Sequence, residues 1–365
     1  MKVLLREFRI IFLLCIAVLS MLICPGPVQS VYAGSEIFLK CAQKYPGDEA
    51  GRLNCYDQLA IPASRESILP DEDADAITGP VSTTLSAERS YLTRVWNLDD
   101  QSSRDPSKLG RLQPYRQNYM LIKKTGNPNY LPSSPLIDHN VTVPIDLDAV
   151  EAKFQLSVKA DIGDQRDVNF LGIKTFRLWV AYTQQSYWQM FNTRNSSPFR
   201  ETDYEPELIA TLGTGNASGL KLINVGWVHQ SNGRPLPESR SWNRIYLLGG
   251  MEWNDMTSIL LRGWGRVPED PLKDDNPDIS DYLGRADLLI RWEPRDKSQA
   301  IGVLLRNNLS LKNNRGYMQI DWAMPVRFGS AARIHIQITS GFGESLIDYN
   351  HRQNTFGLGF SFREW

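Results

Sequence analysis

The sequence lacks several features that would place it in a familiar class of protein. With 40 basic and 41 acidic side chains among 365 residues, it has no basic excess and no clustered basic face of the kind that nucleic acid requires. It has no Gly-x-Ser-x-Gly, His-Glu-x-x-His or Cys-x-x-Cys motif, which disfavours the common soluble hydrolases and redox proteins. After residue 33 it has no continuous apolar run approaching the roughly 20 residues of a membrane helix. We therefore expect neither a nucleic-acid partner nor a helical membrane protein.

The N-terminus has the three parts of a secretory signal peptide. A basic start is followed by an apolar run from Ile10 to about Cys24 and by a cleavage site after Ala33. An uncleaved membrane anchor and a lipoprotein attached through Cys24 are the alternatives, but the run is short for a spanning helix and Ile23 is bulky for a lipoprotein signal. We expect residues 1–33 to be removed and the mature chain to be exported.

Little cysteine remains in the mature chain. Removing residues 1–33 leaves Cys41 and Cys55, together with 37 basic and 40 acidic side chains and a net charge near −3. Two nearby cysteines in an exported chain favour a disulfide, with two buried free thiols as the alternative. Residues 34–113 are otherwise polar and without a sustained period, so we expect a partly disordered N-terminal periplasmic extension that contains this disulfide.

From about residue 114 the sequence alternates between apolar and polar side chains. Between residues 152 and 160, for example, Phe154, Leu156 and Val158 alternate with polar residues, as in a strand with one apolar face. About twelve such runs begin near residues 114, 150, 174, 203, 219, 242, 257, 281, 299, 315, 332 and 354. Many amphipathic strands fit either a soluble sandwich or a membrane barrel.

Three features favour the barrel. The strands are about ten residues long, as a tilted membrane strand requires. Tyr and Trp gather near strand ends, as at membrane interfaces. The chain closes on Leu358, Phe360 and Phe362, although the final Trp365 departs from their alternation by one residue. We therefore expect an all-β fold, a transmembrane antiparallel β-barrel of about 12 strands over residues 114–365, in the outer membrane of a Gram-negative bacterium.

The connections between the expected strands alternate in length. Short ones follow the even-numbered strands and longer ones follow several odd-numbered strands, and outer-membrane barrels have short periplasmic turns and longer outer loops. The longer set, at 189–202, 232–241, 267–280 and 342–353, is therefore expected outside the cell. The 161–173 connection is longer than this rule predicts.

Polar residues interrupt the apolar face of the fifth and sixth expected strands. His229 and Ser231 continue the apolar row of Ile223, and Asn243 shares its face with Ile245, so all three are expected to point outward at the same end of two paired strands. A histidine can take the proton of a serine hydroxyl, and an amide oxygen can orient the histidine. On spacing alone, a polar girdle at the membrane rim is the favoured explanation of these residues.

Two longer segments remove that ambiguity. Residues 226–234 read Gly-Trp-Val-His-Gln-Ser-Asn-Gly-Arg and residues 239–246 read Ser-Arg-Ser-Trp-Asn-Arg-Ile-Tyr, and both resemble outer-membrane phospholipase A with the spacing of that family. Further matches lie at 196–202, 204–206, 274–278 and 343–349. The resemblance covers about residues 114–365 and leaves residues 34–113 outside it.

The resemblance implies a twelve-stranded barrel that hydrolyses the acyl esters of phospholipids and lysophospholipids, with both A1 and A2 activity. It implies that Ser231 is the nucleophile, His229 the general base and Asn243 its orienting partner. A passive channel or a barrel that has lost activity is the alternative from another class.

The resemblance also implies calcium as the cofactor and a homodimer as the active form. Gly233 would offer its backbone N–H to the oxyanion, while the carbonyl of Arg234 and the hydroxyl of Ser239 would bind Ca²⁺ with Ser196 of the partner subunit. Such oxygen ligands suit calcium. Asp275 matches an acidic position that supports a further calcium site, although a turn-forming aspartate is an equal reading.

Two other positions follow from the resemblance. Where the family often has an acidic residue, this chain has Leu236, so we expect weaker calcium binding unless Glu238 compensates. Gln184 continues the apolar row of the third expected strand, and the family uses a glutamine there at its dimer interface. Extension of the Gln184 side chain to the membrane surface is the alternative.

Overall fold

The computed structural model describes Lys44 and residues 89–99, 112–170, 172–327 and 331–362. The expected signal peptide, the expected Cys41–Cys55 disulfide and Trp365 lie outside these described residues. The chain divides into two units, Met1–Thr84 and Leu85–Trp365, and every described residue except Lys44 belongs to the second. None of the described helices is long and apolar enough to cross a membrane.

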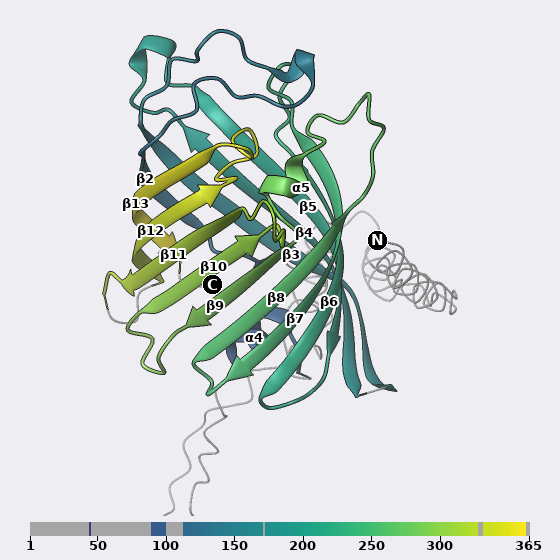
Figure 1. The fold of residues 1–365 in the computed structure, drawn as a ribbon. Coiled ribbons are helices and arrows are strands. Elements are labelled where there is room, and N and C mark those ends of the chain that lie inside the picture. Colours follow the sequence, from purple (N-terminus) through teal and green to yellow (C-terminus); the bar gives the residue numbers. More distant parts are fainter. Residues whose placement is uncertain (1–43, 45–88, 100–111, 171, 328–330, 363–365) are drawn as a thin grey trace, which may run out of the picture. The chain divides into compact units, whose positions relative to one another are not determined.

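The second unit is a closed antiparallel barrel of twelve strands (Figure 1). Its strands are β2 (Tyr119–Thr125), β3 (Val150–Phe170), β4 (Ile173–Trp188), β5 (Phe199–Gly213), β6 (Gly219–Ser231), β7 (Ser241–Trp253), β8 (Thr257–Arg266), β9 (Ala286–Trp292), β10 (Ala300–Asn307), β11 (Gly316–Pro325), β12 (Ala332–Phe342) and β13 (Arg352–Phe362). Each strand pairs with its neighbours in sequence, and β13 pairs with β2 to close the barrel. The expected all-β barrel is confirmed.

The barrel closes where β13 lies very near β2. Phe360 is opposite Met120 in this pairing, and a Cβ atom on the neighbouring Gly359 would lie only 2.1 Å from the carbonyl oxygen of Met120. Glycine is therefore required at this point of the seam. A short additional strand, β1 (Leu112–Pro114), pairs with β3 beyond the end of β2 and so extends the first barrel strand past a break.

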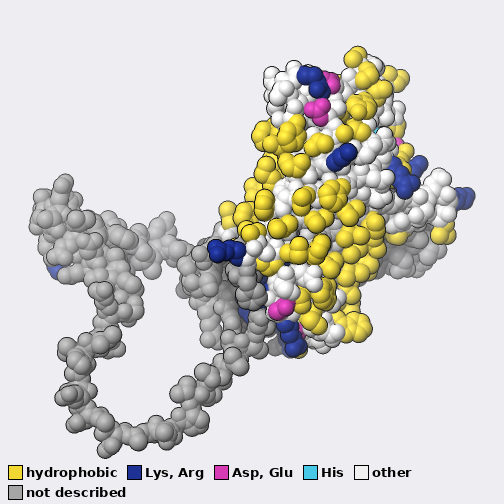
Figure 2. Space-filling view, turned by 90° about the vertical axis from the view of Figure 1, so that its left-hand side faces the viewer, with side chains coloured by type: hydrophobic (Ala, Val, Ile, Leu, Met, Phe, Trp, Pro, Cys, Tyr) yellow, Lys and Arg dark blue, Asp and Glu magenta, His cyan; other side chains and the backbone are white. Residues whose placement is uncertain are grey.

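The barrel has an apolar exterior and a polar interior. On β13, Phe356, Leu358 and Phe360 are exposed, while Thr355 and Ser361, which flank this segment, are buried. Figure 2 shows the apolar side chains gathered over the middle of one face, with charged side chains above and below them. In lipid this pattern places apolar groups against hydrocarbon and leaves polar groups to pair inside.

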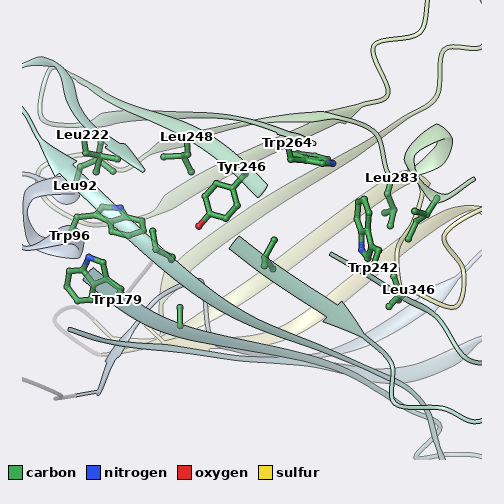
Figure 3. Close-up of a cluster of buried hydrophobic side chains, with 14 of the residues drawn as sticks. Leu92, Trp96, Trp179, Leu222, Trp242, Tyr246, Leu248, Trp264, Leu283 and Leu346 are labelled. Carbon is green, nitrogen blue, oxygen red and sulfur yellow. The ribbon is translucent and has the colours of Figure 1, made fainter. Parts of the chain in front are cut away.

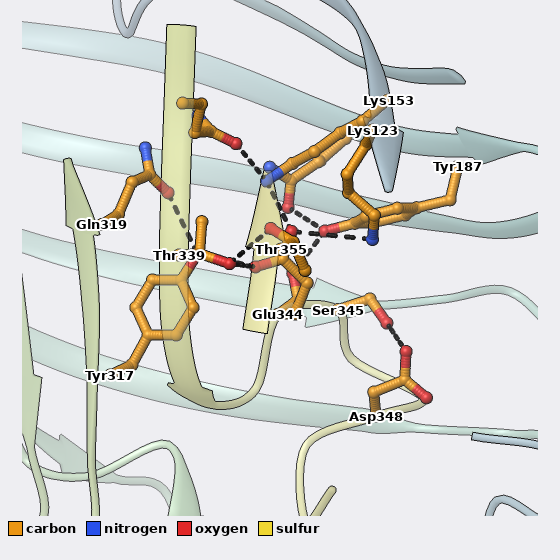
Figure 4. A network of polar contacts seen from close by, with 12 residues as sticks. Lys123, Lys153, Tyr187, Tyr317, Gln319, Thr339, Glu344, Ser345, Asp348 and Thr355 are labelled. Carbon is orange, nitrogen blue, oxygen red and sulfur yellow. Dashed lines mark hydrogen bonds and ion pairs between the residues drawn. The ribbon is translucent and has the colours of Figure 1, made fainter. Parts of the chain in front are cut away.

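Many of the buried charges of the interior are paired with one another. Glu344 accepts from Lys153 at 2.9 Å, from Tyr317 at 2.9 Å and from Thr339 at 2.7 Å, and its backbone carbonyl accepts from Tyr187 (Figure 4). Because a buried charge without a partner is costly, this network holds the β12–β13 loop inside the barrel.

A short helix fills another part of the interior. In α4 (Tyr91–Trp96), Leu92 and Trp96 are buried in an apolar cluster, and Figure 3 shows them beside Trp179. The rings of Trp96 and Trp179 meet edge to face with centroids 6.2 Å apart, and the Lys159 ammonium lies 3.5 Å from the Trp96 ring centroid. The expected boundary at residue 114 therefore does not hold for residues 89–99, which fold with the barrel.

Two other expectations about the strands are corrected. The 161–173 segment, expected as a loop, is mostly strand, because β3 runs to Phe170 and β4 starts at Ile173. The strand expected near residue 281 begins at Ala286, because α5 (Ile279–Tyr282) precedes it and buries Ile279. In the described residues, the long connections of the β4–β5, β6–β7, β8–β9 and β12–β13 hairpins lie at the same end of the barrel (Figure 1).

Candidate active site

The candidate catalytic residues lie at the ends of two paired strands. β6 and β7 are in a register that places His229 directly opposite Asn243 and Ser231 opposite Ser241. His229, Ser231 and Asn243 share the outward face with Trp227, which is 45% exposed, as the strand alternation predicts. All three are half-buried. Their parity places them on the barrel's apolar exterior, and their position at the strand ends places them near the long loops.

One hydrogen bond sets the chemistry of the histidine. His229 Nδ1 and Asn243 Oδ1 are 3.0 Å apart. Because an amide oxygen only accepts, this contact favours the tautomer with a proton on Nδ1 and leaves Nε2 able to take a proton. Among the hydrogen bonds of the described residues there is none between His229 and Ser231. Such contacts often tighten only when substrate binds.

The loop after Ser231 is shaped by the side chain of Asn232. Its Oδ1 accepts from the backbone N–H of Arg240 at 2.9 Å and of Arg234 at 3.3 Å, and its Nδ2 donates to the carbonyl of Glu238 at 2.8 Å. Gly233 has a φ of +61°, which favours glycine. Within the described part of the chain, its N–H makes no hydrogen bond. The Gly233 amide is therefore free to donate to a developing oxyanion.

Oxygen atoms converge beside this loop. Asp275 Oδ2 accepts from Ser239 Oγ at 2.8 Å and from Ser241 Oγ at 3.1 Å, while Asp275 Oδ1 is 3.1 Å from His139 Nε2. A carboxylate with adjacent hydroxyls is a donor set that fits calcium. The described contacts thus bring Ser239 and Asp275 together. They do not bring Ser196 to them, and Ser196 is exposed on the β4–β5 loop.

Arginine side chains fasten the active-site loop. Arg234 donates to the carbonyls of Phe199 and Arg200 and is 3.1 Å from Glu238. Arg240 donates to the His139 carbonyl at 3.1 Å. Burial lowers the pKa of the Arg240 guanidinium, but an arginine keeps its charge at neutral pH. The Glu238 carboxylate is thus paired with Arg234, and both side chains remain partly exposed.

Gln184 lies on the outward face of β4, as its alternation predicts. Its Oε1 accepts from the Tyr182 hydroxyl at 3.0 Å, and its Nε2 donates to Ser186 Oγ at 3.1 Å. The amide is thus satisfied within one chain. If Gln184 pairs with its copy across a two-fold axis, it must give up its hydrogen bonds to Tyr182 and Ser186, because the amide is not left without partners in one chain.

Two residues of the site had no signal in the sequence. His139, from the β2–β3 loop, contacts Asp275, and Glu269, from the β8–β9 loop, accepts from Asn243 Nδ2 at 3.3 Å. Neither residue lies in a periodic segment or in one of the segments that resemble the family. Only the pairing of the strands brings them to the site.

A closed barrel with an apolar exterior, a polar interior and a Ser, His and Asn constellation on its exterior rim defines an integral outer-membrane barrel with a lipid-facing site. A family model described as phospholipase A1 matches residues 92–362. A protein of Neisseria meningitidis serogroup B, provisionally named phospholipase A1, is similar, with 32% identity over 93% of this chain and 94% of its own length. The chain belongs to the phospholipase A1 family.

Solved structures agree with this assignment. The chain is similar to an active-site mutant of Escherichia coli outer membrane phospholipase A in which an asparagine is replaced by alanine, with 31% identity, coverage of 76% and 98% of the two chains and a TM-score of 0.60. It is also similar to a calcium-bound dimer of Salmonella typhi outer membrane phospholipase, with 30% identity, coverage of 75% and 97% and a TM-score of 0.60. With the barrel fold, these likenesses place the chain in the outer membrane of a Gram-negative bacterium.

Proposed function

We propose that this chain is a calcium-dependent phospholipase that hydrolyses acyl esters of phospholipids and lysophospholipids, with A1 and A2 activity. The observation that carries the proposal is the 3.0 Å contact of His229 Nδ1 with Asn243 Oδ1, with Ser231 two residues along the same outward face. A nucleophile on this face meets its substrate in the lipid phase itself, where a soluble enzyme would first have to extract the lipid. Family membership supports the same reaction.

In the proposed reaction, Ser231 Oγ attacks the ester carbonyl while His229 Nε2 takes the hydroxyl proton. Asn243 Oδ1 holds the ring and its Nδ1 proton throughout. The Gly233 N–H donates to the oxyanion of the tetrahedral intermediate. The carbon–oxygen bond to the leaving alcohol then breaks, and that alcohol takes the proton from His229. Water repeats the sequence on the acyl–serine and releases a fatty acid.

The proposed calcium site lies beside the oxyanion position. The Arg234 carbonyl, Ser239 and Asp275 would hold the ion with Ser196 of the partner subunit, since exposed Ser196 does not reach Ser239 within one chain. When bound, the cation would stabilise negative charge that develops on the substrate carbonyl oxygen. A similar Salmonella typhi protein is a dimer with bound calcium. We propose a homodimer as the active form on this basis.

The test is release of fatty acid from phospholipid and lysophospholipid in mixed micelles by the purified full-length protein, with calcium or with a chelator. We expect calcium-dependent release that Ser231→Ala lowers at least about a thousandfold, as removal of a catalytic nucleophile does. Ser340→Ala is the matched control, because Ser340 lies at the end of β12 opposite exposed Met318 and donates to Asn354, away from the triad and the calcium donors. Release that survives Ser231→Ala would refute the nucleophile, and no release from either substrate would refute the activity.

A further inference from the structure

We propose that Glu269 is a positioning residue that fixes the orientation of the Asn243 side chain and, through it, the tautomer of His229. The inference rests on the proposed function, since it assigns a role within the same site. It extends that site by one member, from the β8–β9 loop.

The backbone brings Glu269 to this place. β7 and β8 pair as far as Arg244 opposite Arg266, and the Val267 N–H donates to the Asn243 carbonyl at 2.8 Å, which continues the ladder by one step. Glu269 comes two residues after Val267, beyond the end of β8, and its side chain lies against that of Asn243. Its Oε1 accepts from Asn243 Nδ2 at 3.3 Å, and the group is half-buried.

The two ends of an asparagine amide have opposite hydrogen-bonding properties, and only one end serves the reaction. With Oδ1 toward His229, the ring keeps its proton on Nδ1; with Nδ2 toward it, the amide presents donors and favours the unproductive tautomer. A carboxylate can only accept hydrogen bonds, so Glu269 attracts Nδ2 and leaves Oδ1 for His229. Asn243 lies between the two groups, and each contact supports the other.

The charge of Glu269 contributes in a second way. The proposed reaction makes His229 positively charged when it takes the serine proton, and the rim beside lipid screens charges less than bulk water does. A carboxylate linked to the ring through a single amide therefore favours that charged state over the neutral one. An alternative is that Glu269 is simply a solvated carboxylate of the rim, in which case its removal would act like removal of any nearby charge.

The first test compares Glu269→Ala with Asp270→Ala, which removes the neighbouring exposed carboxylate of the same loop. We expect kcat of Glu269→Ala to fall roughly tenfold with KM changed less than about twofold, as loss of a charge-assisted hydrogen bond would cause. Glu269→Gln, which keeps an acceptor but not the charge, should lie between. Asp270→Ala should leave both constants unchanged, and an equal loss in the two alanine variants would overturn the proposal.

A second test uses the Asn243→Asp variant to separate a positioning role of Glu269 from a general structural role. In Asn243→Asp, both carboxylate oxygens can accept from His229, so no amide needs orienting, and Glu269 becomes a repulsive neighbour. Adding Glu269→Ala to that variant should therefore leave kcat unchanged or raise it. The same tenfold fall in both backgrounds would show that Glu269 only supports the loop and would overturn the proposal.

A readout that needs no catalysis keeps this inference distinct from the proposed activity. In nitrogen-15 histidine spectra of the full chain in micelles, only four histidines contribute, and His229→Gln assigns the signal. We expect the Nδ1–H tautomer in the parent and a mixture of tautomers in Glu269→Ala. An unchanged tautomer would overturn the inference even if the parent releases fatty acid, and a shifted one would support it even if the parent does not.

Discussion

Leu236 is the residue at which this chain departs from the family that it resembles. It is 53% exposed at the tip of the active-site loop, where an apolar side chain gains little from burial. Glu238, the other acidic residue of this loop, is 3.1 Å from the Arg234 guanidinium. In the proposed calcium site, Asp275 is therefore the carboxylate that the described contacts place beside Ser239.

Leu236→Asp should strengthen the binding of calcium. A second carboxylate near the ion adds negative charge, and the number of charged ligands tunes calcium affinity. We expect the calcium concentration for half-maximal fatty-acid release to fall about tenfold, with little change at saturating calcium. Leu236→Asn is the matched control, since it adds polarity without charge. A half-saturation concentration equal to that of the parent would mean that position 236 does not face the ion.

Helix α4 illustrates how an element can belong to a fold without a sequence signal of its own. It has six residues, too few for an amphipathic period, yet Leu92 and Trp96 are buried in the barrel and the Leu92 N–H donates to Glu252 at 2.5 Å. The Lys159 ammonium, fully buried, lies between the rings of Trp96 and Trp179 at 3.5 and 4.3 Å from their centroids. Desolvated contacts of this kind are worth about 2 kcal/mol.

Trp96→Ala should destabilise the barrel without altering the site. Truncation of a buried tryptophan costs about 3–5 kcal/mol, and here it also uncovers the Lys159 ammonium. We expect the free energy of unfolding, measured by circular dichroism in denaturant and detergent, to fall by about 3 kcal/mol or more. Arg94→Ala, on the less buried side of α4, should change it by less than about 0.5 kcal/mol. Equal stability of the two variants would show that α4 contributes no packing energy.

At the scale of the whole molecule, the exterior surface carries both the proposed chemistry and the proposed interface. The proposed triad lies on β6 and β7, and Gln184 lies on β4, two strands away from β6 around the barrel. The polar interior is occupied by paired charges such as Lys153 and Glu344, and by α4. The proposed hydrolysis is therefore expected at the lipid-facing surface, where a second copy of the chain would supply its Ser196 to the proposed calcium site.

Gln184→Ala should weaken the proposed dimer and its activity together. Each copy would lose an amide that can exchange its bonds with Tyr182 and Ser186 for bonds across the interface. We expect a smaller crosslinked fraction in calcium and a roughly proportional loss of fatty-acid release. Gln299→Ala replaces a glutamine at the other end of the barrel, where it accepts from Trp322, and should leave both unchanged. Full activity in a population shown to be monomeric would contradict the dimer.

The sequence by itself determined the barrel, because alternation along strands is local and the lipid phase allows few other solutions. It also determined that His229, Ser231 and Asn243 share a face, since strand parity and register follow from residues close in the chain. Only the tertiary structure decided which loops complete the site. Glu269 reaches Asn243 across 26 positions, His139 reaches Asp275 across 136, and Leu92 reaches Glu252 across 160. The Glu269 contact depends on the path of the loop after β8, and the His139 and Leu92 contacts depend on the closed barrel; no local pattern in the chain encodes any of them.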